Sequence, residues 1–315
     1  MRGVLADENG RFLLKRKERT SRNELLVEAQ LVGLVSALLS DAGVGDLRGI
    51  GVGAIGPVDI RTGAIIRPPN LPVRKIEIAG VLRRAFRVPV YVLNDCTAAC
   101  YGELFFGAGK DLSDLFFVGI GTGIGGGAVV DGRLLLGRNG GAAEIGHIVV
   151  DASGMMRCTC GAYGHWEAYC SGKGIPAFLK KWAEEKGIDK CELEEELRKD
   201  MGSITAKDVL EACRRGENIL ERFLGELMRF NAAGLASIIN AFDPALISVG
   251  GSVALENFDI FIRPAVSFLS SYAFNEVPEV IKSPLGHDAG LYGAVALALR
   301  PPDALLKRTL YARTG

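Results

Sequence analysis

Two cysteines and two histidines lie close together near the middle of the chain. The stretch AEIGHIVVDASGMMRCTCGAYGHWEAY holds two of the three histidines of the protein, one on each side of a Cys-x-Cys pair. Thiolate sulfur and imidazole nitrogen are the ligands of closed tetrahedral zinc sites, so this group predicts a structural Zn²⁺. The candidate ligands are His147, Cys158, Cys160 and His165. Cys-x-Cys is tighter than the usual spacing, and the alternative is a pair of core cysteines beside two surface histidines.

The glycine-rich segment GIGTGIGGG, residues 119–127, directly follows the apolar run DLFFV. Glycines let successive backbone N–H groups approach phosphate oxygens and form an anion-binding nest. The segment lacks the lysine of a P-loop and no helix signal follows it, so neither the P-loop nor the dinucleotide fingerprint fits. The pattern favours a phosphate-binding turn, and the alternative is a glycine-rich hairpin turn.

Asn94 and Asp95 follow the short apolar run VYVL. Ligands of open α/β sheets collect at the carboxyl ends of the strands, so a carboxylate at this point is well placed to meet one. Both residue types are also common at the start of a helix, and capping of a following helix is the alternative.

Glu144 and Glu167 flank the Cys/His group. A carboxylate beside a zinc site can hold a ligating histidine through a hydrogen bond. It can equally accept hydrogen bonds from sugar hydroxyls, and the residues by themselves leave both roles open.

The elements that must position these residues alternate between strand and helix in two rounds. In the first round, RGVLAD and RFLLKRKE flank a turn-like Glu8-Asn9-Gly10 and predict a hairpin. Helix signals near 23–40 and 76–86 then alternate with the apolar runs GIGVGAIG and VPVYVL. The second round begins at LFFVGIG, is mostly helical over 173–240, and ends with the strand signal LISVGG and the helix signal AGLYGAVALALR. This alternation predicts two α/β lobes with mainly parallel sheets.

The two rounds contain similar hairpins. RGVLADENGRFLLKR in the first resembles GGAVV-DGRLLLGR in the second, since both join two apolar strands through an Asp/Gly turn. The second hairpin is preceded by a strand and a glycine turn, VGIGTGIG, whereas nothing precedes the first. If the lobes are duplicates, the first lacks its opening strand and turn.

Composition narrows the class of protein. Lys+Arg and Asp+Glu number 37 each among 315 residues, and this balance argues against a nucleic-acid-binding protein. No run has the length and apolarity of a membrane span, and the first residues lack the apolar core of a signal peptide. The seven cysteines are not spaced as a disulfide framework, so we expect a reducing cytoplasm.

Taken in order, these motifs resemble the ROK family (repressors, open reading frames and kinases) and, within it, the ATP-dependent glucokinases. The segments that carry the resemblance are GVGAIGPVD, PNLP, LNDCTAACYGE, GIGTGIGGG, AEIGH, CTCGAYGHWEAYCSG and ALISVGGSV. The resemblance implies an actin-like, duplicated ribonuclease-H-like α/β fold with the active site between two lobes. The expected lobes are a small one, residues 1–95 completed by the C-terminal helix 288–300, and a large one, residues 96–287.

The resemblance also implies a role for each site residue. Asp95 is the expected base on the 6-hydroxyl of a hexose, accepting the proton late while it orients the oxygen for in-line attack. The residues expected to hold the other sugar hydroxyls are Asn70, Asn94, Glu144, His147 and Glu167. ATP with Mg²⁺ is the expected phosphoryl donor. The residues expected to bind its phosphates are Gly121, Thr122, Gly123, Gly125 and Gly126. Gly250 and Gly251 are expected to lie against the adenosine.

The chain departs from the family pattern twice. His165 stands where members usually have a third cysteine, and imidazole is an equally good zinc ligand. The Asp-x-Gly-Gly-Thr phosphate turn and its strand, which open other members, are absent ahead of RGVLAD. Since positioning supplies most of the catalysis of phosphoryl transfer, we expect slow turnover. The two explanations are a true start upstream of Met1 and a degraded kinase, and we favour the first because every other motif is intact.

Glucose is the preferred substrate among the hexoses, with fructose, mannose and N-acetylhexosamines as alternatives. The alternative functions are a sugar-binding transcriptional regulator, a sugar-binding member without catalysis, and a zinc structural scaffold that binds no sugar. A regulator of this family carries an N-terminal helix-turn-helix, for which this chain has neither the residues nor the basic charge. We expect no nucleic-acid or membrane partner. We expect the chain to form a homodimer or a homotetramer.

Overall fold

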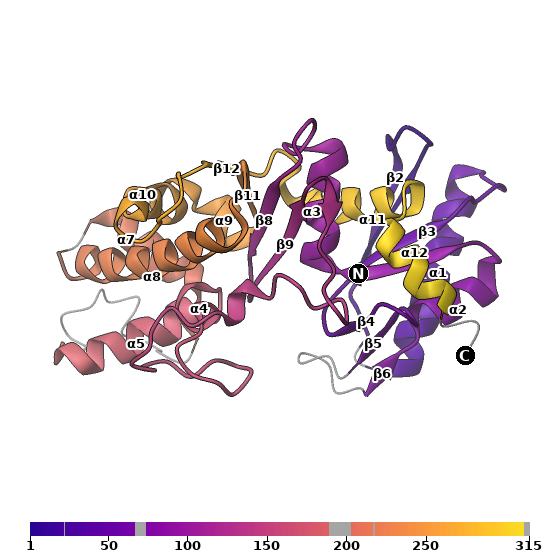
Figure 1. Ribbon diagram of the computed structural model, residues 1–315. Coiled ribbons are helices and arrows are strands. Elements are labelled where there is room, and N and C mark those ends of the chain that lie inside the picture. The colour runs from indigo at the N-terminus through magenta and orange to yellow at the C-terminus, as the bar shows by residue number, and fades with distance from the viewer. Residues whose placement is uncertain (22, 67–73, 189–202, 217, 312–315) are drawn as a thin grey trace. The chain divides into compact units, whose positions relative to one another are not determined.

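The computed structural model describes the chain except residues 22, 67–73, 189–202, 217 and 312–315 (Figure 1). The chain divides into two compact units. Unit 1 comprises Met1–Phe117, Gly127–Ala143 and Asp288–Gly315. Unit 2 comprises Val118–Gly126 and Glu144–His287.

Unit 1 begins with the hairpin that the sequence predicts. Strands β1 (Arg2–Ala6) and β2 (Phe12–Lys17) pair antiparallel. The carboxylate of Asp7 accepts hydrogen bonds from the backbone N–H groups of Asn9 and Arg11, both at 2.9 Å, and so closes the turn between the strands. Helix α1 (Glu24–Ala42) follows and packs against both strands.

A second pair of strands carries the predicted strand end. Strands β3 (Ile50–Ala54) and β7 (Val90–Asn94) pair in parallel, with Ala54 opposite Asn94. A small antiparallel sheet and helix α2 (Ile78–Phe86) connect them. The strands of that sheet are β4 (Val58–Asp59), β5 (Ala64–Ile66) and β6 (Lys75–Ile76). The parallel pairing places Asn94 and the following Asp95 at the carboxyl end of the pair.

Two close-packed helices complete unit 1. Helix α3 (Asp95–Phe106) lies against α11 (Ala289–Leu299), and α12 (Asp303–Tyr311) follows α11. A Cβ added to Gly102 would come within 2.6 Å of the Gly293 nitrogen, so only glycines permit this approach. Helices α3 and α11 both belong to unit 1, and the expected lobe boundary at residue 95 stays a prediction.

A five-stranded sheet has the order β10-β9-β8-β11-β12. Its strands are β8 (Leu115–Ile120), β9 (Ile124–Val130), β10 (Arg133–Leu134), β11 (Leu246–Gly250) and β12 (Glu279–Lys282). Every residue of β8 and β11 is buried. Strands covered on both faces have continuous apolar sequences, such as LFFVGI, instead of alternating ones.

Helices make up most of unit 2, as expected for residues 173–240. Among the described residues of unit 2, the α-helices are α4 (Trp166–Cys170), α5 (Gly174–Lys186), α7 (Ala206–Arg215), α8 (Asn218–Phe242), α9 (Ser252–Glu256) and α10 (Arg263–Val266). The described residues also form the 3₁₀ turns η1 (Ile145–His147), η4 (Leu269–Ser271) and η5 (Gly286–Asp288), and the π-helical turn η3 (Phe258–Ile262). The buried Trp166 joins two of these elements, because its indole N–H donates to Asn231 on α8 at 3.1 Å. This anchor fixes α4, which carries Glu167.

The strand orders of unit 1 and of the five-stranded sheet correspond. The antiparallel pair β2-β1 matches β10-β9, and the parallel pair β3-β7 matches β11-β12. Among the described residues, no strand of unit 1 takes the place that β8 holds between the two pairs. Most residues of β1 and β3 are only half-buried, in contrast to the buried β11. The missing opening strand therefore stays a prediction.

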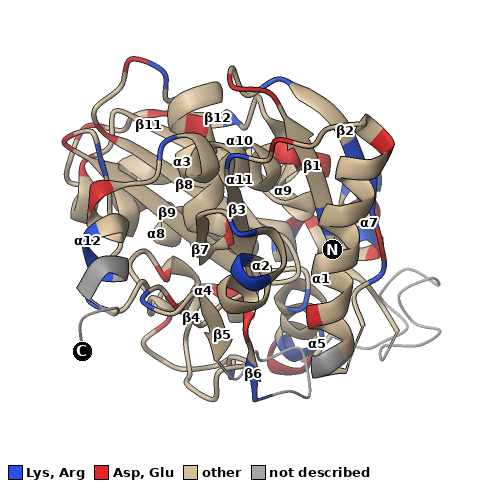
Figure 2. Cartoon of the chain, turned by 90° about the vertical axis from the view of Figure 1, so that its right-hand side faces the viewer, with Lys and Arg blue, Asp and Glu red and all other residues tan. Residues whose placement is uncertain are grey.

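Charged residues of both signs are scattered over the visible elements (Figure 2), in keeping with the equal numbers of acidic and basic side chains. Helix α2 carries two of the basic ones, Arg83 and Arg84, in its last turn, where they face the negative end of the helix dipole. None of the helices in the described part of the chain combines the length and the apolarity needed to cross a membrane.

Candidate active site and metal centre

Asn94 and Asp95 lie where β7 passes into α3. The Oδ1 atom of Asn94 accepts hydrogen bonds from the backbone N–H groups of Cys96 at 2.9 Å and of Thr97 at 3.4 Å, so Asn94 caps the helix. The Oδ1 atom of Asp95 also accepts from the N–H of Cys96, at 2.8 Å. Asn94 thus takes the capping role, one of the two roles open to this pair, through its side-chain oxygen.

The side chain of Asp95 is exposed to solvent at the start of α3. Desolvation by the surrounding protein raises the pKa of its carboxyl above the ordinary value, and the hydrogen bond from the N–H of Cys96 offsets only part of this. A carboxylate whose pKa is raised toward the working pH is a better proton acceptor. The position and the pKa of Asp95 suit a general base.

The glycine-rich segment divides into a turn and a strand. Gly121, Thr122 and Gly123 form the turn between β8 and β9, closed by a hydrogen bond from the N–H of Gly121 to the carbonyl of Gly123 at 2.9 Å. Thr122 is exposed at the tip. Gly125 and Gly126 lie within β9, and Gly126 is buried. A tight turn with an exposed tip leaves backbone groups accessible to a phosphate.

Gly250 and Gly251 form the turn between β11 and α9, next to the glycine turn. Gly251 has φ of +85°, and a Cβ there would come within 2.3 Å of the carbonyl oxygen of Ile120. A Cβ at Gly121 would lie 3.8 Å from the hydroxyl of Ser252. The chain itself therefore requires glycine at 251, whatever ligand the turn meets.

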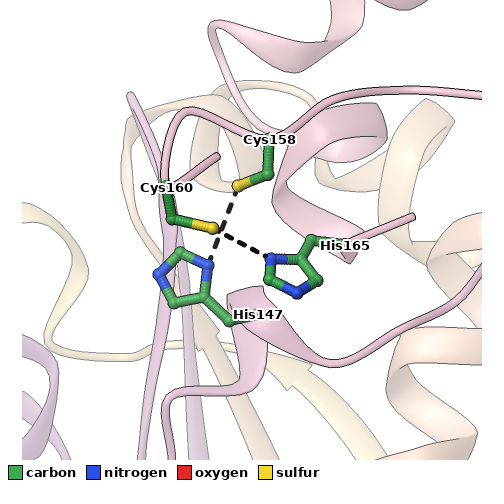
Figure 3. Close-up of side chains that lie close together, drawn as sticks. All are labelled: His147, Cys158, Cys160 and His165. Atoms are coloured by element: carbon green, nitrogen blue, oxygen red, sulfur yellow. Dashed lines mark hydrogen bonds between the residues drawn. The ribbon is translucent and has the colours of Figure 1, made fainter. Parts of the chain in front are cut away.

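The four Cys/His residues come together in unit 2, as Figure 3 shows. Their ligand atoms all lie within 4.8 Å of one another. Cys158 Sγ is 3.8 Å from His147 Nδ1, and Cys160 Sγ is 3.3 Å from His165 Nδ1. With Zn–S near 2.3 Å and Zn–N near 2.0 Å, a tetrahedral site separates sulfur and nitrogen by about 3.5 Å. The donor types and the distances both fit Zn²⁺.

The loop that carries the two cysteines is folded by its own hydrogen bonds. The carboxylate of Asp151 accepts from the N–H groups of Ser153 at 2.9 Å and Met155 at 3.0 Å, and from the hydroxyl of Tyr169. The N–H of Met156 donates to the same tyrosine oxygen at 3.1 Å. Asp151 and Tyr169 were not among the predicted site residues, although an Asp-x-Ser turn signal precedes the Cys-x-Cys pair.

Burial affects the protonation of the metal ligands. It raises the pKa of the Cys158 thiol to about 11, and the nearby Cys160 and Glu167 add to the rise. Desolvation also lowers the pKa of His165. A metal ion binds the thiolate, so binding to Cys158 must release a proton.

The two predicted carboxylates differ in their surroundings. Glu167, in the first turn of α4, accepts hydrogen bonds from the N–H of Ile124 at 2.9 Å and from the hydroxyl of Thr159 at 3.0 Å. Glu144 is exposed and directly precedes η1. Asn70 lies outside the described residues. In unit 2 the structure thus groups Glu167, the metal ligands and the glycine turn, and in unit 1 it pairs Asn94 with Asp95.

Comparisons with known proteins agree on one family. The sequence profile of the ROK family matches residues 1–301. A glucokinase of Pyrobaculum calidifontis is 36% identical over 306 residues, which cover 97% of this chain and 94% of the relative. A crystal structure of a ROK family glucokinase from Streptomyces griseus in complex with glucose and AMPPNP matches with a TM-score of 0.75 and 32% identity, over 93% of this chain and 94% of that one.

A ROK family transcriptional regulator, a homolog of the E. coli MLC protein, also matches, with a TM-score of 0.79 and 25% identity. The match covers 99% of this chain and 78% of the regulator. The α/β fold is that of the ROK sugar kinases, of the actin-like type, which confirms the fold that the resemblance implied. Because the family profile spans nearly the whole chain and these structures share its fold, the chain belongs to the ROK family.

Proposed function

We propose that the chain is an ATP-dependent glucokinase, which transfers the γ-phosphoryl group of ATP to the 6-hydroxyl of glucose. The observation that carries this proposal is its similarity, over nearly its full length, to ROK glucokinases, one of which was crystallised with glucose and AMPPNP. The solvent-open carboxylate of Asp95 at a strand end supplies the base that such a transfer uses.

Asp95 orients the 6-hydroxyl for in-line attack and accepts its proton late, because the hydroxyl is a weak acid and the transition state is loose. The amide NH₂ of Asn94, whose oxygen caps α3, donates to a neighbouring sugar hydroxyl. Glu144, His147 and Glu167 hold further hydroxyls, together with Asn70. Oε2 of Glu167 accepts one hydrogen bond, from the N–H of Ile124, and has a second lone pair for the sugar, whereas Oε1 accepts from the hydroxyl of Thr159 and the thiol of Cys158.

The turn Gly121–Gly123 binds the phosphates of ATP with Mg²⁺, and the turn at Gly250 and Gly251 lies against the adenosine. Gly125 and Gly126 support the turn from β9. Zn²⁺, held by the four Cys/His ligands, supplies a cross-link that fixes the ring of His147. A ring fixed in this way presents its other edge to the sugar without loss of side-chain entropy on binding.

A coupled ADP-release assay over glucose, fructose, mannose and N-acetylhexosamines tests the function. We expect glucose to give the highest kcat/KM. Asp95→Ala should abolish turnover and leave the affinity for glucose, measured by calorimetry, within a few-fold of the original. Turnover that survives in Asp95→Ala would rule out Asp95 as the base.

We also propose that unit 1 takes one further strand between β1 and β3, in the place that β8 holds between β9 and β11. The half-buried residues of β1 and β3 support this, because a strand between them would cover both edges. The turn that follows such a strand corresponds to Gly121–Gly123 and would bind phosphate. A protein of residues 1–315 should then turn over slowly, and addition of an apolar strand and an Asp-x-Gly-Gly-Thr turn upstream should accelerate it. Equal rates would contradict this proposal.

The similarity to a transcriptional regulator supports a second candidate, a sugar-binding member without catalysis. It predicts calorimetric binding of glucose with no ADP release, even after the upstream extension. A homodimer or homotetramer stays a prediction for either function, and sedimentation would test it.

A further inference from the structure

The backbone N–H and the backbone carbonyl of Ile124 are each contacted by a segment that carries a metal ligand. Ile124 is the first residue of β9 and directly follows the turn Gly121–Gly123. Its N–H donates to Oε2 of Glu167 at 2.9 Å. Its carbonyl oxygen would lie 2.1 Å from a Cβ added to Gly146, so η1 packs directly against it. Gly146 precedes the candidate ligand His147.

The second oxygen of Glu167 faces the metal loop. Oε1 accepts the hydroxyl of Thr159 at 3.0 Å and lies 3.8 Å from the sulfur of Cys158. Thr159 is the residue between the two cysteine ligands, and Glu167 stands two residues after His165. A single carboxylate therefore spans the distance between the Cys-x-Cys pair and the glycine turn.

The segment that follows Glu167 holds the turn itself. The N–H of Gly172 donates to the carbonyl of Gly121 at 2.7 Å, and the N–H of Lys173 donates to the carbonyl of Thr122 at 3.3 Å. Glu167 lies on α4, which ends just before these residues and is anchored in the core by Trp166. Backbone and side-chain contacts from the segment 165–173 thus reach every residue from Gly121 to Ile124.

We infer that occupancy of the Cys/His site controls the order of the glycine turn, with Glu167 as the positioning residue that connects them. A bound metal cross-links four points of the loop and removes most of its freedom to open. The fixed Thr159 then holds the carboxylate of Glu167, which holds the N–H of Ile124. A turn ordered in advance binds phosphate more tightly, because less freedom is lost on binding. By thermodynamic reciprocity, a ligand that orders the turn must also tighten metal binding.

Hydrogen exchange of the amides in residues 118–126, measured with Zn²⁺ bound and after chelation, tests the connection. We expect chelation to accelerate exchange about tenfold, as for the loss of one hydrogen bond. Glu167→Ala should exchange at this faster rate even with Zn²⁺ bound, and should not respond further to chelation. Glu185→Ala, an exposed change on α5, is the matched control and should behave as the original protein. Exchange that is unaffected by chelation, or a Glu167→Ala protein that still responds to it, would overturn the inference.

Residues 246–250 of the buried strand β11 report whether chelation unfolds unit 2 as a whole. If chelation unfolds unit 2 as a whole, the Thr159→Val variant tests the connection instead, because this change removes the hydroxyl and leaves all four ligands in place. With Zn²⁺ bound, it should accelerate exchange several-fold in residues 118–126 alone, and no change would contradict the inference. The affinity for AMPPNP, expected to weaken about tenfold on chelation, rests on the proposed function. A turn that responds in exchange but binds no AMPPNP would refute that function and leave the connection standing.

Discussion

The side-chain oxygen Oε2 of Glu167 accepts a hydrogen bond from the backbone N–H of Ile124 across 2.9 Å, where α4 meets the start of β9. The same oxygen would lie only 2.4 Å from a Cβ added to Gly123. The carboxylate therefore occupies the space that any side chain at position 123 would need. This contact predicts how the turn responds to substitution.

Gly123→Ala should weaken nucleotide binding more than it weakens the fold. The new methyl group pushes the carboxylate off the N–H of Ile124, and one hydrogen bond contributes about 1 kcal/mol. We expect KM for ATP to rise about five- to tenfold. Kinetics at saturating glucose measure this, and an unchanged KM for ATP would contradict it.

Gly251→Ala should destabilise the protein by about 2 kcal/mol or more, because alanine is strained at φ of +85° and its methyl group meets the carbonyl of Ile120. Gly225→Ala is the control, since Gly225 lies in α8 and, apart from the backbone of its own helix, none of the described residues has an atom within 4 Å of the added carbon. The control should stabilise by about 0.5–1 kcal/mol. Urea unfolding measures both, and similar losses in the two proteins would argue against the clash.

The raised pKa of Asp95 predicts the pH dependence of the reaction. The base accepts a proton only when ionised, so kcat/KM for glucose should fall as the pH drops through the raised pKa. We expect the midpoint above the ordinary carboxyl value of about 3.9. A pH–rate profile measures it, and a midpoint at or below that value would show that desolvation does not act on Asp95.

The same shift affects stability. When folding raises the pKa of a carboxyl, the folded state binds the proton more tightly than the unfolded state, so the free energy of unfolding increases as the pH falls. At neutral pH the ionised Asp95 therefore destabilises the fold. Asp95→Asn keeps the oxygen that accepts from Cys96 and removes the charge. It should therefore raise the free energy of unfolding at neutral pH while abolishing turnover. A loss of stability in this variant would contradict the assignment.

Removal of the metal should lower the melting temperature, and the chelator concentration needed to remove it should depend on pH. Binding must displace a proton from Cys158, whose pKa is raised to about 11, so the affinity for Zn²⁺ should rise with pH. A chelator titration followed by thermal unfolding at two pH values measures this. Cys160→Ala, at an exposed ligand, should melt at the same temperature with and without chelator.

Tyr169→Phe should loosen the metal loop without removing a ligand. The change deletes the hydroxyl that donates to Asp151 and accepts from the N–H of Met156. We expect a loss of about 1–3 kcal/mol in stability, because a buried partner is left without its hydrogen bond. Weaker binding of Zn²⁺, measured by competition with a chelator, should accompany it, and unchanged binding would show that the loop is held by the metal alone.

The sequence by itself determined the local features of this protein. The apolar runs and the Glu8-Asn9-Gly10 turn predicted the first hairpin, and the run VYVL placed Asp95 at a strand end. The types of the four Cys/His residues predicted a metal site within one short stretch, where chain connectivity alone keeps the ligands near one another. These features depend on neighbours in sequence and on residue type, and both are visible in a single chain.

Only the tertiary structure decided which distant groups meet. In the structure Asn94 caps α3, and Gly102 and Gly293 let α3 pack against α11. The carbonyl of Ile120 lies so close to Gly251 that a side chain there would clash with it. The tertiary structure also placed Glu167 between Thr159 and Ile124, which no spacing indicated. Such contacts arise when separate elements pack in one particular arrangement, and sequence periodicity records which face of an element is buried but not which partner covers it.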